Sequence, residues 1–259
     1  MALDERFIAR LGKLSESQLT AIRNIVDQLE RPAEFVRSRN SDLISPCILR
    51  EFGDMLRIHH CFSSQSFTKD KFEYAMERAF NMCGRAASLS SRGNPGSDVV
   101  IDDVAYSLKT QADSGIKTDV IFISKFMELG KGEWNNKPKQ LVGLRERFLK
   151  HMEGYARILT LRHFEVADDH RYELVEIPKA LLQESGGGAY QMMLTSRQLP
   201  KPGTFTVKDA NGEVKFQLYF DGGTERKLQV RQISIALCTV HAEWRFPRGI
   251  KIAEGTALA

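Results

Sequence analysis

Apolar residues recur at helical spacing through the first third of the chain. Ser15 and Gln18 form a capping-box pattern at the start of one such run, and Pro32 follows its end. The positions that repeat in this run are Leu19, Ile22, Val26 and Leu29. Further helices are predicted over about 46–56 and from 68 to about 85. The second of these has one apolar stripe, made of Phe72, Met76, Ala79, Phe80 and Cys83.

The middle of the chain changes to short β-type runs. Residues 90–96 form a cluster of Ser, Gly, Asn and Pro that breaks helices, and strands are predicted at 98–101, 104–109 and 120–123. Ser124 is placed to cap a short helix behind the last of these strands. A helix is predicted over 138–155 and strands over 157–166 and 172–177, after which Pro178 opens a short helix.

The last third is rich in β-type runs at 204–208, 213–220 and 227–237, joined by Gly-containing turns. This order of elements predicts an α/β (α+β) fold with a central mixed β-sheet flanked by helices. We divide the chain into a helical N-terminal region (1–66), a core (67–185) and a β-rich C-terminal extension (186–259), all within one compact domain.

Composition and charge narrow the function classes. The 259 residues are 42% apolar and 27% charged, as in an ordinary globular protein, and contain no apolar run long enough for a membrane span. The acidic start does not resemble a signal peptide, and four cysteines do not make a disulfide framework, so a cytoplasmic location is expected. The net charge is +4, and residues 197–251 hold ten Lys and Arg against five Asp and Glu. This basic third suits either a phosphate-facing surface or a plain solvated face.

A hairpin in the middle of the chain carries the candidate chemistry. If residues 102–103 form the turn, alternation places Val99, Ile101, Val104, Tyr106 and Leu108 on one apolar face. On the other face Asp98 lies opposite Ser107 and diagonal to Lys109, within side-chain reach. An acid that holds Mg²⁺ beside a lysine that serves the attacking water suits phosphodiester hydrolysis. A single carboxylate supplies few ligands for a metal ion, so a second carboxylate is sought. The candidates are Glu73, which lies at the edge of the apolar stripe of its helix, Glu128 and Glu77.

These residues resemble the PD-(D/E)xK nuclease superfamily, because an acid, a short hairpin and x-x-Lys on the neighbouring strand follow a helix with a glutamate. The size and one-chain layout are most similar to type II restriction endonucleases, with a restriction-endonuclease-like core over about 68–177. The resemblance implies a site-specific endonuclease that cuts double-stranded DNA in restriction-modification defence. It also implies that Mg²⁺ is the cofactor and that the enzyme is a homodimer. The catalytic set is then Asp98, Ser107, Lys109 and Glu73, with Asp98, Glu73 and Glu128 as metal ligands. The chain departs from the pattern at Ser107, which replaces the second acid, and at Pro95, which is not adjacent to Asp98.

The C-terminal strands supply candidate DNA-reading residues. Lysine, glutamine, tyrosine and arginine side chains alternate with apolar ones and share one face of a ribbon that fits the major groove, where Gln pairs with adenine and Arg with guanine. The residues proposed to bind DNA are Lys215, Gln217, Tyr219, Lys227, Gln229 and Arg231. The same pattern is typical of a solvated sheet face.

Other features are given structural interpretations. His59-His60-Cys61 is read as a partly buried turn and not as a zinc site, because adjacent residues seldom converge on one ion. His163, His241 and Trp244 are predicted core residues, whereas Trp134 is either a loop anchor or a DNA contact.

Three other functions stay open at this point. A repair or junction-resolving nuclease would prefer branched DNA, and a non-catalytic DNA-binding protein would bind without cleaving. A protein-interaction domain would bind DNA weakly and without dependence on salt. The helical start, 1–66, suits either dimer contacts or contacts with the DNA backbone.

Overall fold

The computed structural model describes residues 4–91, 96–113, 115–130, 134, 137–186 and 188–248. Its larger sheet has seven strands in the order β1-β12-β7-β6-β4-β3-β2. Strands β4 and β6 are parallel and the other neighbouring pairs are antiparallel, so the sheet is mixed, as predicted. In sheet order the strands are Glu34–Arg37, Thr239–Pro247, Asp169–Ile177, Arg157–Val166, Val104–Gln111, Val99–Ile101 and Ala87–Leu89.

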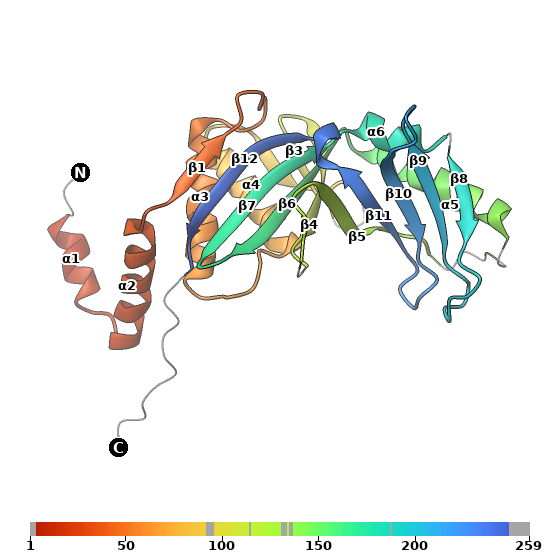
Figure 1. Ribbon diagram of the computed structural model, residues 1–259. Coiled ribbons are helices and arrows are strands. Elements are labelled where there is room, and N and C mark those ends of the chain that lie inside the picture. The colour runs from red at the N-terminus through yellow and green to blue at the C-terminus, as the bar shows by residue number, and fades with distance from the viewer. Residues whose placement is uncertain are drawn as a thin grey trace, which may run out of the picture.

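A second sheet of five antiparallel strands has the order β5-β11-β10-β9-β8. It lies at the end of the molecule away from the N-terminus (Figure 1). Its meander of β9, β10 and β11 matches the prediction of strands separated by glycine-containing turns. In sheet order its strands are Val120–Glu128, Lys227–Ser234, Val214–Phe220, Gly203–Lys208 and Ala189–Met192.

The helices begin and end close to the predicted positions. The Ser15–Gln18 capping box forms, with the Gln18 side chain accepting from the Ser15 N–H at 2.8 Å. Figure 1 shows α1 and α2 at one end of the molecule, beyond β1. The α-helices are Glu5–Leu11, Glu16–Glu30, Pro46–His60, Lys69–Met82, Pro138–His151 and Lys179–Gln183, and short 3₁₀ turns cover Met152–Gly154, Glu184–Gly186 and Ile235–Leu237.

Two hydrophobic clusters hold these layers together. Helices α3 and α4 pack against one face of the seven-stranded sheet, where Phe52, Phe72 and Trp244 are fully buried. The other cluster joins α5 to the five-stranded sheet and to the opposite face of β6 and β7. Each large apolar side chain removed from water contributes about 1.5–3 kcal/mol to stability. The predicted divisions at 66 and 185 stay a prediction, and both clusters are built from segments distant in the sequence.

The predicted hairpin forms with the predicted register, because Ile101 pairs with Val104 and Val99 pairs with Tyr106. Asp102 and Asp103 both adopt left-handed conformations (φ of 46° and 64°), the geometry of a two-residue primed turn. The Asp102 carboxylate accepts hydrogen bonds from Arg85 and from the Ala86 N–H, which favours an Asp-Asp turn despite its low intrinsic preference.

Three sequence predictions about secondary structure are wrong. Ser124 caps no helix, because β5 continues through it to Glu128. The pairing of Met127 with Leu228 of β11 keeps this part of the chain in the sheet. The strand expected over 227–237 ends at Ser234 and gives way to a 3₁₀ turn. The turn expected at 59–61 is instead the end of α3, which continues to His60. Strands β1, β2 and β8 were missed because they are short and mostly exposed, and β12 was anticipated only as a strand-like run around His241 and Trp244.

A disulfide joins Cys47 in the first turn of α3 to Cys83 at the end of α4. The four cysteines thus form one disulfide and not a disulfide framework, because Cys61 and Cys238 are free. The pairing follows from helix packing, which brings Cα atoms 36 positions apart in sequence to 5.9 Å. Among the described residues, no helix is both long and apolar enough to cross a membrane.

Candidate active site

Asp98 lies directly before β3, where the hairpin enters the sheet. Its Oδ2 accepts hydrogen bonds from the backbone N–H of Leu108 at 2.6 Å and from the Ser107 hydroxyl at 3.3 Å. Its Oδ1 accepts from the Lys69 ammonium at 2.7 Å. These donors fix the carboxylate against β4, as the predicted register requires. The neighbouring Pro95 lies outside the described residues.

Lys109 holds a buried ammonium on the same face of β4. Its Nζ donates to Ser107 Oγ at 2.8 Å and lies 5.2 Å from the centre of the Phe126 ring. Burial disfavours the charged form and lowers the pKa of Lys109 to about 8. A lysine with this pKa can act near neutral pH either as a positive charge or as a proton acceptor.

Glu73 reaches the site from the first turns of α4. Its Oε1 lies 3.1 Å from Lys69 Nζ, so one ammonium joins the carboxylates of Glu73 and Asp98. Burial raises the pKa of Glu73 above its ordinary value. Burial also opposes the charge of Lys69, but the two carboxylates outweigh it and raise the pKa of that group. Two carboxylates that hold one cation form a donor set that fits a divalent metal ion.

His151 and Tyr155 border the site and were not predicted from the sequence. His151 Nε2 and the Tyr155 hydroxyl are buried polar atoms for which the described residues provide no hydrogen bond. Gly96, with a φ of +94°, passes so close that a Cβ there would lie 2.7 Å from the Tyr155 ring and 2.9 Å from the His151 ring. Burial and the nearby Lys109 lower the pKa of His151, which keeps its imidazole neutral. The sequence carries no signal for these two residues, except that both rings lie near the end of the helix predicted over 138–155.

A cavity of about 380 Å³ opens beside these groups. Lys69 and Lys109 line it together with the backbone and side chains of β5 from Ile123 to Met127. The site is therefore accessible between the start of α4 and the two sheets, where a polyanion would meet positive charge first.

The other two candidate carboxylates have different partners. Glu128 is exposed at the end of β5, and its Oε1 accepts from Lys125 at 2.8 Å. The helix that was expected to direct it inward is absent there, as described above. Glu77 accepts from the backbone N–H of Leu89 at 3.1 Å, which ties α4 to β2. Glu73 is thus the candidate that the structure brings to Asp98.

The predicted DNA-reading residues share one face of β10 and β11. Cross-strand pairs join Gln217 to Arg231 and Tyr219 to Gln229, and the Arg231 guanidinium lies 3.6 Å from the centre of the Tyr219 ring. Arg231 also donates to Gln229 Oε1 at 2.8 and 2.6 Å. At the edge of this group, Lys215 pairs with Glu184 and Lys227 with Glu225.

The opposite face of these strands is buried, as the alternation predicted. Val230 and Ile233 both point into the core although they are three positions apart, because the pairing with β5 shifts between them and Gln232 takes a φ of 55°. A bulge of this kind cannot be read from alternation alone.

Three other residues lie where the sequence analysis expected them. Trp244 is buried beside Phe52. Trp134 is a buried loop anchor whose Nε1 donates to the Lys201 carbonyl at 2.6 Å. His241 is a buried histidine whose nitrogens are satisfied by Ser41 and Glu176.

Two comparisons with known proteins identify the family of this chain. A family model described as "SmaI: Type II site-specific deoxyribonuclease" matches residues 7–246. The chain is 41% identical over 248 residues to "Type II restriction enzyme SmaI" from Serratia marcescens. The aligned region covers 95% of this chain and 98% of that protein. No solved structure matches. The match confirms the resemblance to type II restriction endonucleases that the size and one-chain layout indicated.

Proposed function

The chain belongs to the SmaI family of type II site-specific deoxyribonucleases, and from this premise we propose that Asp98, Glu73 and Lys109 form its Mg²⁺-dependent centre for cutting double-stranded DNA. A type II restriction endonuclease hydrolyses phosphodiester bonds, so the centre needs a metal site, a group that serves the attacking water and contacts to the phosphate.

The observation that carries this proposal is the position of the Lys69 ammonium between two carboxylates. It lies 2.7 Å from Asp98 Oδ1 and 3.1 Å from Glu73 Oε1, at the place where a cation meets both. The Lys69 side chain is 42% exposed, so it can turn to solvent when Mg²⁺ takes over its two partners. Ser107 stands where the superfamily pattern has a second acid, and Glu73 would supply the missing charge from α4. When bound, Mg²⁺ would polarise the phosphate and lower the pKa of a nearby water.

Lys109 would orient the attacking water and offset the negative charge that develops on the phosphate. Its hydrogen bond to Ser107 and the packing under Phe126 hold the amine in one position, so little reorganisation is needed during the reaction. Ser107 would act as a positioning residue, because its hydroxyl joins Lys109 to the Asp98 carboxylate.

Tyr155 and His151 would complete the phosphate contacts. Each has a buried polar atom that the described part of the chain leaves without a partner, and burying such an atom costs roughly 1–3 kcal/mol. A phosphate oxygen bound at the centre would accept a hydrogen bond from the Tyr155 hydroxyl. The polar face of β10 and β11 would read the bases, with Arg231, Gln217 and Gln229 as donors and acceptors.

We also propose that the enzyme acts as a homodimer in the cytoplasm. A palindromic site has the symmetry of two identical subunits, and each subunit would cut one strand. Apolar side chains on α1 and α2 support this arrangement, because Phe7, Ile8 and Val26 are 44%, 53% and 45% exposed. Sedimentation of Ile8→Glu beside the wild type tests it: a dimer that persists unchanged in the variant would remove this surface from the interface.

The centre is tested by cleavage of a long, sequence-diverse duplex with Mg²⁺ or with EDTA. Wild type should give discrete fragments that require Mg²⁺, whereas Asp98→Asn and Lys109→Ala should give none while still binding DNA. Asp103→Asn is the matched control, because Asp103 lies on the exposed turn of the same hairpin. Full cleavage by Asp98→Asn would show that the metal site lies elsewhere. Loss of cleavage in Asp103→Asn alone would show that the assay reports the folding of the hairpin instead.

A further inference from the structure

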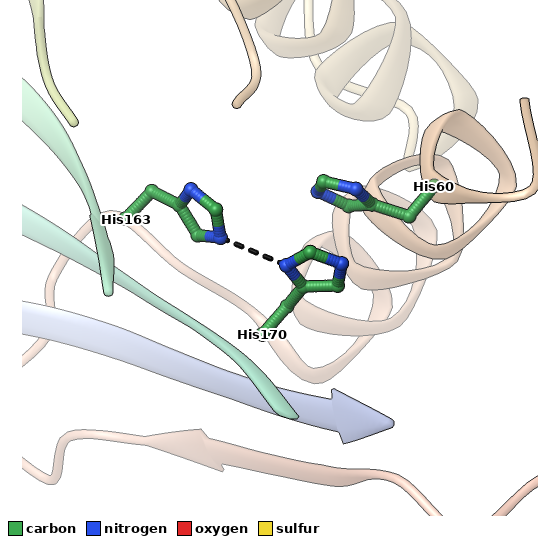
Figure 2. Close-up of side chains that lie close together, drawn as sticks. All are labelled: His60, His163 and His170. Atoms are coloured by element: carbon green, nitrogen blue, oxygen red, sulfur yellow. Dashed lines mark hydrogen bonds between the residues drawn. The ribbon is translucent and has the colours of Figure 1, made fainter. Parts of the chain in front are cut away.

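A cluster of three histidines lies outside the nuclease centre, on the face of the larger sheet that α3 covers. His60 comes from the last turn of α3, His163 from β6 and His170 from β7, and all three are buried. Figure 2 shows the rings of the three residues turned toward one another. His163 Nε2 and His170 Nδ1 are 2.9 Å apart, and the His60 ring stacks on His170 with centroids 3.6 Å apart. One nitrogen from each residue lies within 4.8 Å of the other two.

The outer nitrogens of two of these rings are already oriented by other groups. His60 Nδ1 donates to the Ser63 carbonyl at 3.0 Å, which leaves the lone pair of its Nε2 free to accept. The Tyr172 hydroxyl accepts from the Phe67 N–H and lies 2.7 Å from that Nε2, to which it donates. His163 Nδ1 lies 2.7 Å from the Ser66 hydroxyl, so its Nε2 faces the cluster. Metal-binding histidines are held in the same way, with the second nitrogen bonded to a carbonyl or hydroxyl.

Burial places the three rings together in one small volume, since His60, His163 and His170 are 5%, 4% and 5% exposed. A neutral imidazole has one lone pair, and one of the two facing nitrogens in the His163–His170 hydrogen bond carries the proton. When an ion binds, that proton would move to the other nitrogen of its ring, so that each ring offers one lone pair to the ion.

We propose that His60, His163 and His170 bind a divalent transition-metal ion of the Zn²⁺ type through His60 Nε2, His163 Nε2 and His170 Nδ1. Zinc–nitrogen bonds of about 2.0–2.1 Å in a tetrahedral site separate the nitrogens by roughly 3.4 Å. His163 Nε2 and His170 Nδ1 are 2.9 Å apart, and one nitrogen of each ring lies within 4.8 Å of the other two, so small side-chain rotations would bring three ligands to that spacing. A water molecule would take the fourth position of a tetrahedral site. Ion binding would replace the hydrogen bond from Tyr172 to His60 and the one between His163 and His170.

The donor type distinguishes this site from the nuclease centre. Imidazole nitrogens select zinc, copper or nickel, whereas Mg²⁺ prefers the carboxylate oxygens of Asp98 and Glu73. A second cluster of candidate ligands, Asp42, Glu176 and His241, carries no such proposal because Arg157 donates to both of its carboxylates. The guanidinium already supplies the positive charge there.

A metal ion in this cluster would brace the sheet that carries the active-site lysine. It would join the end of α3 to the β6–β7 hairpin, and β6 pairs with β4 so that Thr160 lies beside Lys109. The role proposed is structural, and it stands independently of the roles proposed for Asp98 and Lys109.

The test uses the full chain after treatment with EDTA and dialysis. We expect the wild type to take up about one equivalent of Zn²⁺ by titration calorimetry, with a higher Tm in the loaded protein because the ion binds only the folded state. Co²⁺ should bind at the same site and give the visible absorption bands of a four-coordinate ion with nitrogen ligands. Asp98→Asn with Glu73→Gln should bind Zn²⁺ as the wild type does, which separates this site from the nuclease centre.

Substitutions in the cluster decide whether the three histidines are the ligands. His163→Gln and His170→Asn should each weaken Zn²⁺ binding at least about 100-fold. His59→Gln is the matched control, since His59 neighbours His60 but its nitrogens face Gln65 and Lys71. The metal-free Tm of each variant, measured in EDTA, shows that it has folded. The proposal is overturned if the wild type takes up neither Zn²⁺ nor Co²⁺, or if both cluster variants that fold bind as the wild type does, because the trio is then a hydrogen-bonded core network.

Discussion

Replacing Lys109 by methionine separates the chemistry of the buried ammonium from its effect on stability. Methionine has nearly the same length and fills the space beside Phe126, but it has no charge to desolvate. Lys109 is only 6% exposed in the wild type, so its charge is held almost entirely out of water. We therefore expect Lys109→Met to be more stable than the wild type and to cleave DNA poorly.

The size of the stability gain follows from the pKa. Burial lowers the pKa of Lys109 from 10.5 to about 8, and the difference corresponds to about 3 kcal/mol near pH 7, where the group is charged in both states. Loss of the hydrogen bond to Ser107 takes back about 1 kcal/mol, which leaves a net gain of about 2 kcal/mol.

The gain should depend on pH in a defined direction. Because the folded-state pKa is depressed, the folded protein loses this proton first as pH rises above about 8, and the wild type recovers stability up to about pH 10.5. The advantage of Lys109→Met should thus fall below about 1 kcal/mol near pH 9.5.

Unfolding by guanidinium near pH 7 and near pH 9.5 measures the difference in stability between the variant and the wild type. A cleavage assay with Mg²⁺ measures the effect on catalysis. Cleavage should fall by about 10²–10⁴-fold, as for the loss of a group that serves proton transfer or charge stabilisation. Lys13→Met, at an exposed position, is the control and should change neither quantity. A stability gap that is absent near pH 7, or that does not shrink on raising the pH, would refute the energetic reasoning, and full cleavage by the variant would refute the catalytic role.

Three further predictions concern the centre and the DNA-reading face. Glu73→Gln should raise the Mg²⁺ concentration for half-maximal cleavage by at least about tenfold, and an unchanged Mg²⁺ titration would remove Glu73 from the metal site. Arg231→Ala should weaken specific DNA binding by about 1–3 kcal/mol and relax the sequence preference, measured by competition with altered sites; unchanged cleavage and preference would rule it out as a reader. Gly96→Ala should destabilise the fold by about 1–3 kcal/mol and reduce cleavage, because its φ of +94° and the Tyr155 ring leave no room for a Cβ; a variant with wild-type unfolding and activity would contradict that close approach.

The sequence by itself determined the local parts of this protein. Alternation with period two placed Asp98, Ser107 and Lys109 on one face of a hairpin, because neighbouring strands joined by a two-residue turn can pair in few registers. The capping box at Ser15 and the buried stripe around Phe72 were equally readable, since each depends on contacts within four residues. The hairpin motif together with the size and layout of the chain was enough to indicate a type II restriction endonuclease, the class to which the matching family belongs.

Only the tertiary structure decided which distant residues meet. The sequence left Glu73, Glu77 and Glu128 as alternatives, and the packing of α4 on the sheet brought Glu73 to Asp98 through a lysine that no pattern had singled out. Ser124 became part of a strand because β11, about a hundred residues away, pairs with β5 on both sides of it, at Ile123 and Met127, which overrides the local preference of Ser124 for a helix cap. The histidines of Figure 2 come from three elements, and their convergence depends on the sheet order. Periodicity reports the face on which a side chain lies, whereas the partner opposite that face is set by chain topology.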